Sequence, residues 1–214
     1  MTLVVVIDYG MGNLHSIAKA LQHVASDAVI EVTGDPERIR AADRVVFPGV
    51  GAIRDCMHQI GSRGLIPVLT EVSALKPFFG VCLGMQALLS RSEENGGVHG
   101  LGLFEGEVVK FPDGLKLSTG ENLKIPHMGW NRVRTIRSHP LFEGIEQGSW
   151  FYFVHSYYTK PLNDEDIAAV TDYSGEFASA LIRNNVAAVQ FHPEKSQDAG
   201  LRLLRNFLSW EPFS

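Results

Sequence analysis

The feature that most constrains the fold is the alternation of short apolar runs with amphipathic segments in the N-terminal part of the chain. Four such runs read LVVVI (3–7), AVIEVT (28–33), RVVFPG (44–49) and PFFGVC (77–82). β-rich runs that alternate with helices are typical of a parallel sheet covered on both faces. We therefore expect an α/β fold of the flavodoxin-like kind, with a mostly parallel central sheet flanked by helices.

Segments with helical spacing separate these runs. Apolar residues from Leu14 to Val24 repeat every three to four positions, with Asn13 available as N-cap. A short helix is predicted around DPERIRAA, another stretch after Gly51, and a third over LGMQALLS directly after the fourth run.

The pattern changes from Gly102 onward to successive strands joined by turns. The predicted strands are LFEGEVVKF, WNRVRTI, SWFYFVHSYYT, DIAAVTDY, FASALIRNN and VAAVQF, followed by a closing helix over 199–208. They suggest antiparallel additions to the parallel core, with a flexible loop at 112–124. No shift in composition divides the chain, so residues 1–214 are predicted to form one domain.

Composition excludes several classes of function. A net charge of −5 gives no electrostatic reason to expect nucleic acid or an anionic membrane as partner. Two cysteines without C-x-x-C spacing suggest neither a disulfide framework nor a zinc site, and we expect no metal and no cofactor. The low cysteine count fits a reducing, cytoplasmic setting best. The first apolar run is expected to be a buried strand and not a signal peptide or membrane span.

Cys82 lies where an apolar strand gives way to a helical pattern, between Gly80 and Gly84. This G-x-C-x-G spacing is the cysteine version of a nucleophile elbow, in which small neighbours allow a sharp turn. The helix N-terminus would favour the thiolate, and the backbone N–H of Leu83 could face a developing oxyanion. The alternative is a buried cysteine without a chemical role, which is our interpretation of Cys56.

A thiolate nucleophile needs a histidine base and a group that orients it. In an extended segment Glu194 would lie alongside the His192 ring, at the end of an apolar strand. We expect one ring nitrogen of His192 to reach Cys82 and the other to reach Glu194. Two further histidines, His127 and His155, are interpreted as structural or interface groups. The other five are interpreted as surface groups or as groups with satisfied hydrogen bonds: His15, His23, His58, His99 and His139.

Two glycine-containing segments allow different interpretations. FPGVGA (47–52) could bring a second backbone N–H to an oxyanion, although a tight strand-to-helix turn is nearly as consistent with its spacing. DYGMGNLH lacks the third glycine and the acidic residue of a dinucleotide-binding motif, so such a site is not expected.

Together these motifs resemble the class I (triad-type) glutamine amidotransferases, which share G-x-C-x-G-x-Q, P-G-x-G and H-P-E in this order. Within that family, IDYGMGNL, PHMGWN, FYFVHSY and VQFHPEKS are similar to the glutaminase subunits of imidazole glycerol phosphate synthase. The resemblance implies hydrolysis of L-glutamine by Cys82, His192 and Glu194. It also implies that Gly49, Val50, Gly51 and Leu83 surround the oxyanion, and that Gln86, Ser156 and Tyr157 help to hold glutamine.

The resemblance further implies a partner that consumes ammonia, a (β/α)8-barrel cyclase subunit that forms a heterodimer with this chain. Met and Trp are enriched at interfaces, so PHMGWN is the predicted contact: Pro126, His127, Met128, Gly129, Trp130 and Asn131. A turn packed within the chain is the alternative for this segment. For the whole chain, the alternatives are a glutaminase of another synthase, a catalytically inactive regulatory module of the same fold, and a cysteine peptidase.

Overall fold

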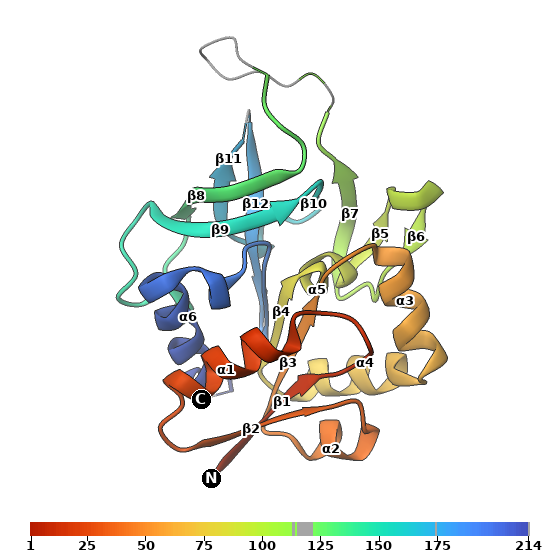
Figure 1. Ribbon diagram of the computed structural model, residues 1–214, viewed down its shortest axis with the longest axis vertical. Coiled ribbons are helices and arrows are strands. Elements are labelled where there is room, and N and C mark those ends of the chain that lie inside the picture. Colours follow the sequence, from red (N-terminus) through yellow and green to blue (C-terminus); the bar gives the residue numbers. More distant parts are fainter. Residues whose placement is uncertain (113, 115–121, 174, 214) are drawn as a thin grey trace.

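The parallel strands predicted from the N-terminal alternation form the centre of the sheet. A computed structural model describes residues 1–112, 114, 122–173 and 175–213. Within these ranges, thirteen strands join in one sheet (Figure 1). The parallel part has the order β2-β1-β3-β4-β13 and consists of β2 (Ala28–Thr33), β1 (Thr2–Ile7), β3 (Arg44–Gly49), β4 (Phe78–Cys82) and β13 (Val186–Val189).

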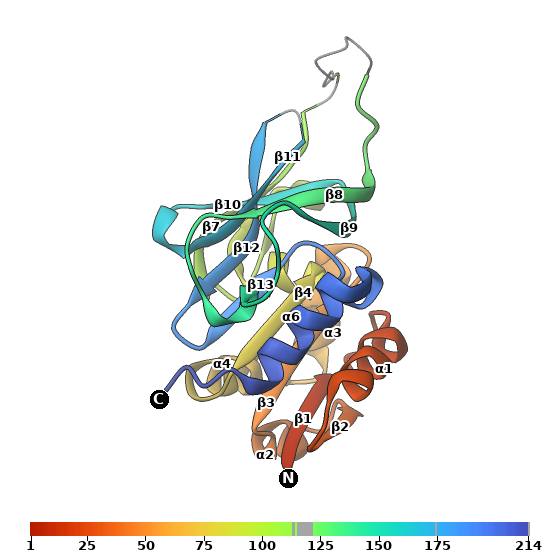
Figure 2. The ribbon, with the colours of Figure 1, turned by 90° about the vertical axis from the view of Figure 1, so that its left-hand side faces the viewer.

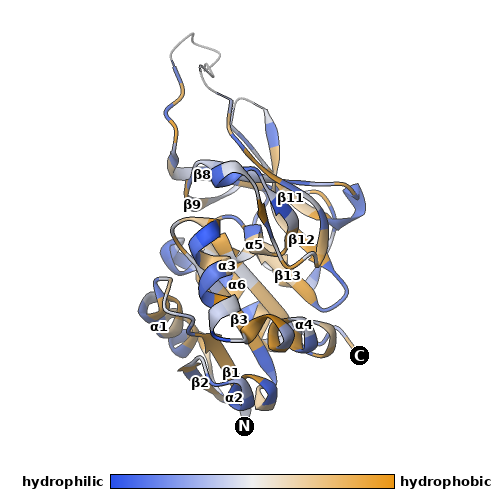
Figure 3. Ribbon diagram, turned by 90° about the vertical axis from the view of Figure 1, so that its right-hand side faces the viewer, coloured by the Kyte–Doolittle hydropathy of each residue, from blue (hydrophilic) through white to orange (hydrophobic). Residues whose placement is uncertain are grey.

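Helices cover both faces of these strands, as the alternation predicted. The side chains of Val4 and Val6 in β1 face one core, with α1 (Leu14–Val24) and α6 (Gln197–Ser209). Figure 2 shows these two helices next to each other. Val5 and Ile7 face a second core, with α2 (Pro36–Ala41), α3 (Ile53–Ser62) and α4 (Leu65–Leu75). Figure 3 shows hydrophobic residues concentrated along the central strands between these layers.

The remaining strands extend the sheet beyond β13, and they pair antiparallel except for β5 and β7, which pair parallel. They are β12 (Glu176–Arg183), β10 (Tyr157–Pro161), β7 (Phe104–Lys110), β5 (Leu89–Ser92) and β6 (Val98–His99), with β11 (Ile167–Asp172), β8 (His127–Thr135) and β9 (Ser149–His155) branching from β12. β8 and β9 pair antiparallel over their length and lie across the carboxyl end of the parallel strands (Figure 1).

Three details differ from the sequence predictions. VAAVQF contributes β13, which pairs parallel to β4 and belongs to the central sheet; all four of its residues are buried. The helix predicted over LGMQALLS ends early: α5 (Leu83–Ala87) is followed by β5, because pairing with β7 outweighs the local helical pattern. SWFYFVHSYYT is divided at Ser156 into β9 and β10, which pair with different strands.

Smaller differences concern loops and caps. The stretch after Gly51 forms two helices, α3 and α4, rather than one. Asn13 occupies the N-cap position of α1, but its side chain makes no capping hydrogen bond. In the predicted loop 112–124, residues 113 and 115–121 lie outside the described residues. None of the helices in the described ranges is long and apolar enough to cross a membrane.

Candidate active site

Cys82 occupies a strained turn between β4 and α5. Its φ of 56° and ψ of −111° lie outside the regions that residues with a side chain normally adopt. The turn is held by close packing of α5 on β3, since a Cβ at Gly84 would lie 1.9 Å from the carbonyl oxygen of Phe47. The strand–turn–helix context of a nucleophile elbow is therefore present around Cys82.

The glycine loop that follows β3 lies beside this turn. Gly49 pairs with Cys82 in the parallel register, and a Cβ there would lie 2.6 Å from the hydroxyl of Tyr9. That hydroxyl donates a hydrogen bond of 2.9 Å to the carbonyl of Pro48, and burial raises the pKa of Tyr9, so it remains a donor. Tyr9 therefore holds the loop in place through Pro48. Val50 of the loop lines the pocket and is 38% exposed.

His192 and Glu194 form the predicted pair, although the backbone between them is not extended. Pro193–Lys195 is a turn of 3₁₀ helix, which brings Glu194 Oε1 to 2.8 Å from His192 Nδ1. Both side chains are buried, at 2% and 3% exposure. The backbone is fixed by a hydrogen bond from His192 N to Tyr152 O and one from Ser196 Oγ to His192 O.

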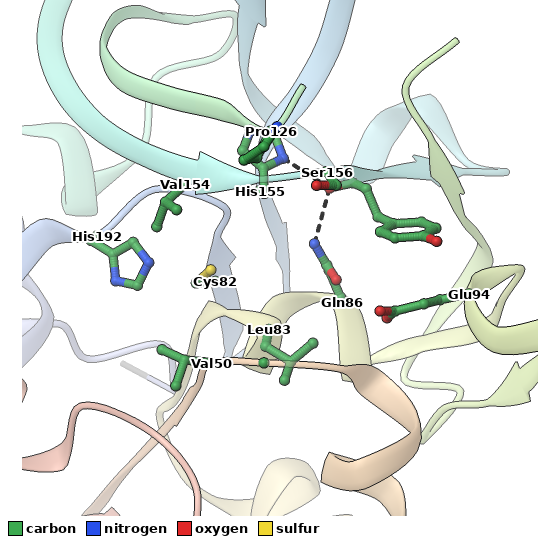
Figure 4. A pocket seen from close by; sticks show the side chains of 12 residues that line it. Val50, Cys82, Leu83, Gln86, Glu94, Pro126, Val154, His155, Ser156 and His192 are labelled. Carbon is green, nitrogen blue, oxygen red and sulfur yellow. Dashed lines mark hydrogen bonds between the residues drawn. The ribbon is translucent and has the colours of Figure 1, made fainter. Parts of the chain in front are cut away.

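The second ring nitrogen, Nε2 of His192, has no hydrogen-bond partner among the described residues. The predicted contact with Glu194 is thus present, whereas the predicted contact with Cys82 is not a direct hydrogen bond. Figure 4 shows the side chains of His192 and Cys82 facing each other across the pocket. Burial alone would lower the pKa of His192, but Cys82 and Glu194 outweigh it and raise this pKa to about 10. The ring is therefore protonated at neutral pH.

A cavity of about 320 Å³ opens above Cys82 (Figure 4). Eight of the residues predicted for the site line it: Val50, Gly51, Cys82, Leu83, Gln86, Ser156, Tyr157 and His192. Gly49 and Glu194 are not among the lining residues but contact two that are, since Gly49 pairs with Cys82 and Glu194 binds His192; Pro126 of the predicted interface lines the cavity. Sequence reasoning missed Glu94 and Val154 as lining residues, and it did not place His155 here.

Gln190 is a further group that the sequence analysis missed. It is fully buried, and its Nε2 lies 3.8 Å from the sulfur of Cys82. Its Oε1 accepts a hydrogen bond of 3.1 Å from Gln86 Nε2. A polar residue inside the apolar run VAAVQF was the signal that could have found it, because a buried amide needs partners.

Residues 127–131 of the segment PHMGWN belong to β8 and point alternately to two sides, whereas Pro126 precedes the strand. Met128 and Trp130 are 62% and 44% exposed, whereas His127 is buried. The amide of Asn131 points inward, to the His127 ring and to the Asp172 carbonyl. Only the outward residues of this segment are therefore available to a partner in this conformation.

The protein-family comparison matches this chain over residues 5–210 to the family described as "Glutamine amidotransferase class-I". The chain belongs to the class-I glutamine amidotransferases. Among curated proteins, class-I members named "Imidazole glycerol phosphate synthase subunit HisH" are 63% identical in Methylococcus capsulatus and 57% identical in Nitrosococcus oceani. The alignments cover 100% of this chain in both cases, and 99% and 100% of those proteins.

Solved structures with much lower sequence identity share the fold. A glutamine amidotransferase from Thermotoga maritima superposes with a TM-score of 0.63 at 15% identity, covering 100% of this chain and 99% of that one. The structure of PurLQS from Thermotoga maritima gives a TM-score of 0.73 at 14% identity, with 97% and 98% covered. The predicted α/β fold with a mostly parallel sheet is confirmed.

Proposed function

We propose that this chain is the glutaminase subunit of imidazole glycerol phosphate synthase in histidine biosynthesis. It hydrolyses L-glutamine to glutamate and ammonia and passes the ammonia to a cyclase subunit. The observation that carries the proposal is the convergence of Cys82, His192 and Glu194 at one pocket, in a chain whose relatives bear that synthase's name. Residues 1–214 act as one glutaminase domain.

In the proposed reaction, the thiol proton of Cys82 has moved to His192, and the thiolate sulfur attacks the side-chain amide carbon of glutamine. The carbon–nitrogen bond breaks as the protonated His192 ring gives its proton to the departing ammonia, which leaves a thioester on Cys82. Water then attacks the thioester while Nε2 of His192 accepts its proton, and glutamate departs from the restored cysteine. Glu194 holds the ring through Nδ1 and stabilises its charged form.

Backbone groups stabilise the negative oxygen that forms in both steps. Leu83 is the first residue of α5, so its N–H has no acceptor within the helix. The loop Gly49–Val50–Gly51, anchored at Pro48 by Tyr9, supplies the second donor. Neither step uses a metal or a cofactor.

In this proposal glutamine is held by Gln86, Ser156 and Tyr157, together with Glu94, which lines the same cavity. Glu94 provides a carboxylate at the pocket wall, and its Oε2 also accepts a hydrogen bond from the N–H of Ile53, 3.0 Å away. The α-ammonium group of an amino-acid substrate is the natural partner for such a carboxylate.

Glu94→Gln should therefore raise KM for glutamine about tenfold and change kcat much less, because it removes a charge but keeps the acceptor for Ile53. Steady-state glutamate release measures this. The matched control is Glu107→Gln at an exposed position of β7, with kinetics like those of the wild type. An unchanged KM in Glu94→Gln would remove Glu94 from the substrate site.

The outward face of β8 and β9 is the proposed contact with the cyclase. In register, it pairs Met128 with Val154, Trp130 with Tyr152 and Arg132 with Trp150. Three of these residues are exposed large hydrophobic side chains: Met128, Trp130 and Trp150. Val154 and the nearby Pro126 line the pocket, so a partner on this face sits next to the place where ammonia forms. In this proposal the partner on this face is a (β/α)8-barrel cyclase that uses ammonia, and the two chains form a cytoplasmic heterodimer.

Trp130→Ala should weaken the association by roughly tenfold or more, because aromatic residues at the centre of an interface contribute most to binding. Isothermal titration of the chain with the cyclase measures the dissociation constant. Leu75→Ala is the matched control, since Leu75 is 63% exposed at the end of α4, away from β8. If both variants bind like the wild type, Trp130 lies outside the contact.

The proposed function as a whole is tested by mixing the chain with the cyclase and measuring glutamate release with and without the ribotide acceptor. Glutamine-dependent formation of imidazole glycerol phosphate is the expected result. A mixture that forms the product from ammonia but never from glutamine would contradict the proposal.

A further inference from the structure

Two buried histidines on the inward face of β8 and β9 have no part in the proposed reaction. His127 and His155 lie opposite each other in register and are 3% and 6% exposed. The rings lie in an aromatic cluster with Phe111, Phe153 and Phe177. Burial lowers the pKa of His127 to about 4 and that of His155 to about 3, so both are neutral at pH 7.

A neutral histidine has one N–H and one acceptor nitrogen, which fixes the direction of every bond here. Nδ1 of His155 lies 2.8 Å from the carbonyl oxygen of Tyr157, which can only accept, so Nδ1 carries the proton. Nε2 of His155 must then accept, at 2.9 Å, from Nδ1 of His127. Nε2 of His127 in turn accepts from Asn131 Nδ2 at 3.2 Å. The second N–H of that amide donates to the carbonyl of Asp172, at 2.9 Å.

A second series of hydrogen bonds connects the Tyr157 carbonyl with the nucleophile Cys82. Gln86 Nε2 donates to the Tyr157 oxygen at 3.0 Å and to Gln190 Oε1 at 3.1 Å. Gln190 Nε2 then lies 3.8 Å from the Cys82 sulfur. The Tyr157 oxygen thus accepts from both His155 and Gln86, so both of its lone pairs are used. Figure 4 marks these bonds with dashed lines that start at His155 and at Gln86.

This arrangement leaves the Gln86 side chain a single orientation. Both of its N–H groups are engaged, and no described residue donates to its Oε1, which therefore remains for a ligand in the pocket. A Tyr157 carbonyl without the bond from His155 would lose one of the two donors that hold it in place, and with it the fixed acceptor for Gln86.

We infer that His127 and His155 are positioning residues for the substrate pocket: with Asn131 they form a directed hydrogen-bond relay that fixes the Tyr157 carbonyl and, through it, Gln86. The inference rests on the proposed glutaminase reaction for its kinetic effect, but not for the relay itself. Neither histidine touches the reacting atoms in this scheme.

The relay is tested directly on the wild-type chain by NMR. Two-bond 1H–15N spectra at pH 7 report which ring nitrogen of each histidine is protonated. We expect both rings to be neutral and protonated at Nδ1. A proton on Nε2 of either ring, or a charged ring, would overturn the relay, whatever reaction the chain catalyses.

The positioning role is tested by two substitutions that separate hydrogen bonding from packing. His127→Phe keeps an aromatic ring in the cluster but removes the donor to His155, whereas His127→Asn keeps a donor near Nδ1 and loses the ring. The relay predicts that the Phe variant raises KM for glutamine about tenfold, with a smaller change in kcat, and that the Asn variant stays within about threefold of the wild type. A packing role predicts the opposite order and would overturn the inference.

Phe111→Leu is the matched control, because Phe111 touches both histidine rings without entering the relay; its KM should stay at the wild-type value. Thermal melting identifies any variant that fails to fold, and for such a variant the NMR result decides. A wild-type chain that releases no glutamate with the cyclase would count against the proposed function, and the tautomers would still decide the relay.

Discussion

Cys82→Ala is expected to lower glutamine-dependent synthesis by the complex at least roughly a thousandfold, while ammonia-dependent synthesis continues. In the proposed reaction, the thioester forms on the sulfur of Cys82. Added ammonia enters the reaction after that step and does not need the thioester. Measuring product formation with glutamine and with ammonium salts in parallel separates the two activities.

Cys56→Ala is the matched control for this substitution. Cys56 is buried in α3, and burial raises the pKa of its thiol to about 11, so it supplies no thiolate at neutral pH. This variant should keep both activities. If Cys82→Ala loses the ammonia-dependent activity as well, the proposed division of labour between the subunits is wrong.

His192→Ala should lower glutamate release by a similar factor, because in the proposed reaction this one ring first protonates the departing ammonia and then accepts the proton of water. Glu194→Ala should cause a smaller loss, since the imidazole remains but loses its 2.8 Å partner and the stabilisation of its charged form. Initial rates of glutamate formation at saturating glutamine compare the variants.

His99→Ala is the control for the removal of a histidine, because His99 is exposed in β6. It should be as active as the wild type. Turnover within a few-fold of the wild type in His192→Ala would disprove the proposed triad, and equal losses in the His192 and Glu194 variants would show that orientation matters as much as the base itself.

Four of the five parallel strands, β1 to β4, were predictable because their signals are local. Each apolar run between 3 and 82 is long enough for a buried strand, and each helix between the runs has its own amphipathic spacing. The end of α5 and the place of β13 were not predictable in this way. Both depend on pairing with strands that lie far away in the sequence, and that pairing outweighs local preference.

The residues of the candidate site also differ in whether a local sequence signal identifies them. Cys82, His192 and Glu194 stand in short motifs whose spacing carries their chemistry, so the sequence was enough to find them. Glu94 has no such signal, because its carboxylate reaches the cavity only through the packing of β5 and the loop after it. The two buried histidines were noticed among aromatic residues, but their partners come from strands and turns that only the fold brings together.

The pairing of β8 with β9 gives neighbouring residues of one short segment different consequences when they are changed. In 127–132 the even positions face outward and the odd positions face the core, so a residue-by-residue scan should show phenotypes with a period of two: partner affinity, then substrate use, then partner affinity again. One inserted residue in this segment would exchange the two sets. A single substitution in this segment should therefore affect one of the two properties, whereas a change in its length should affect both.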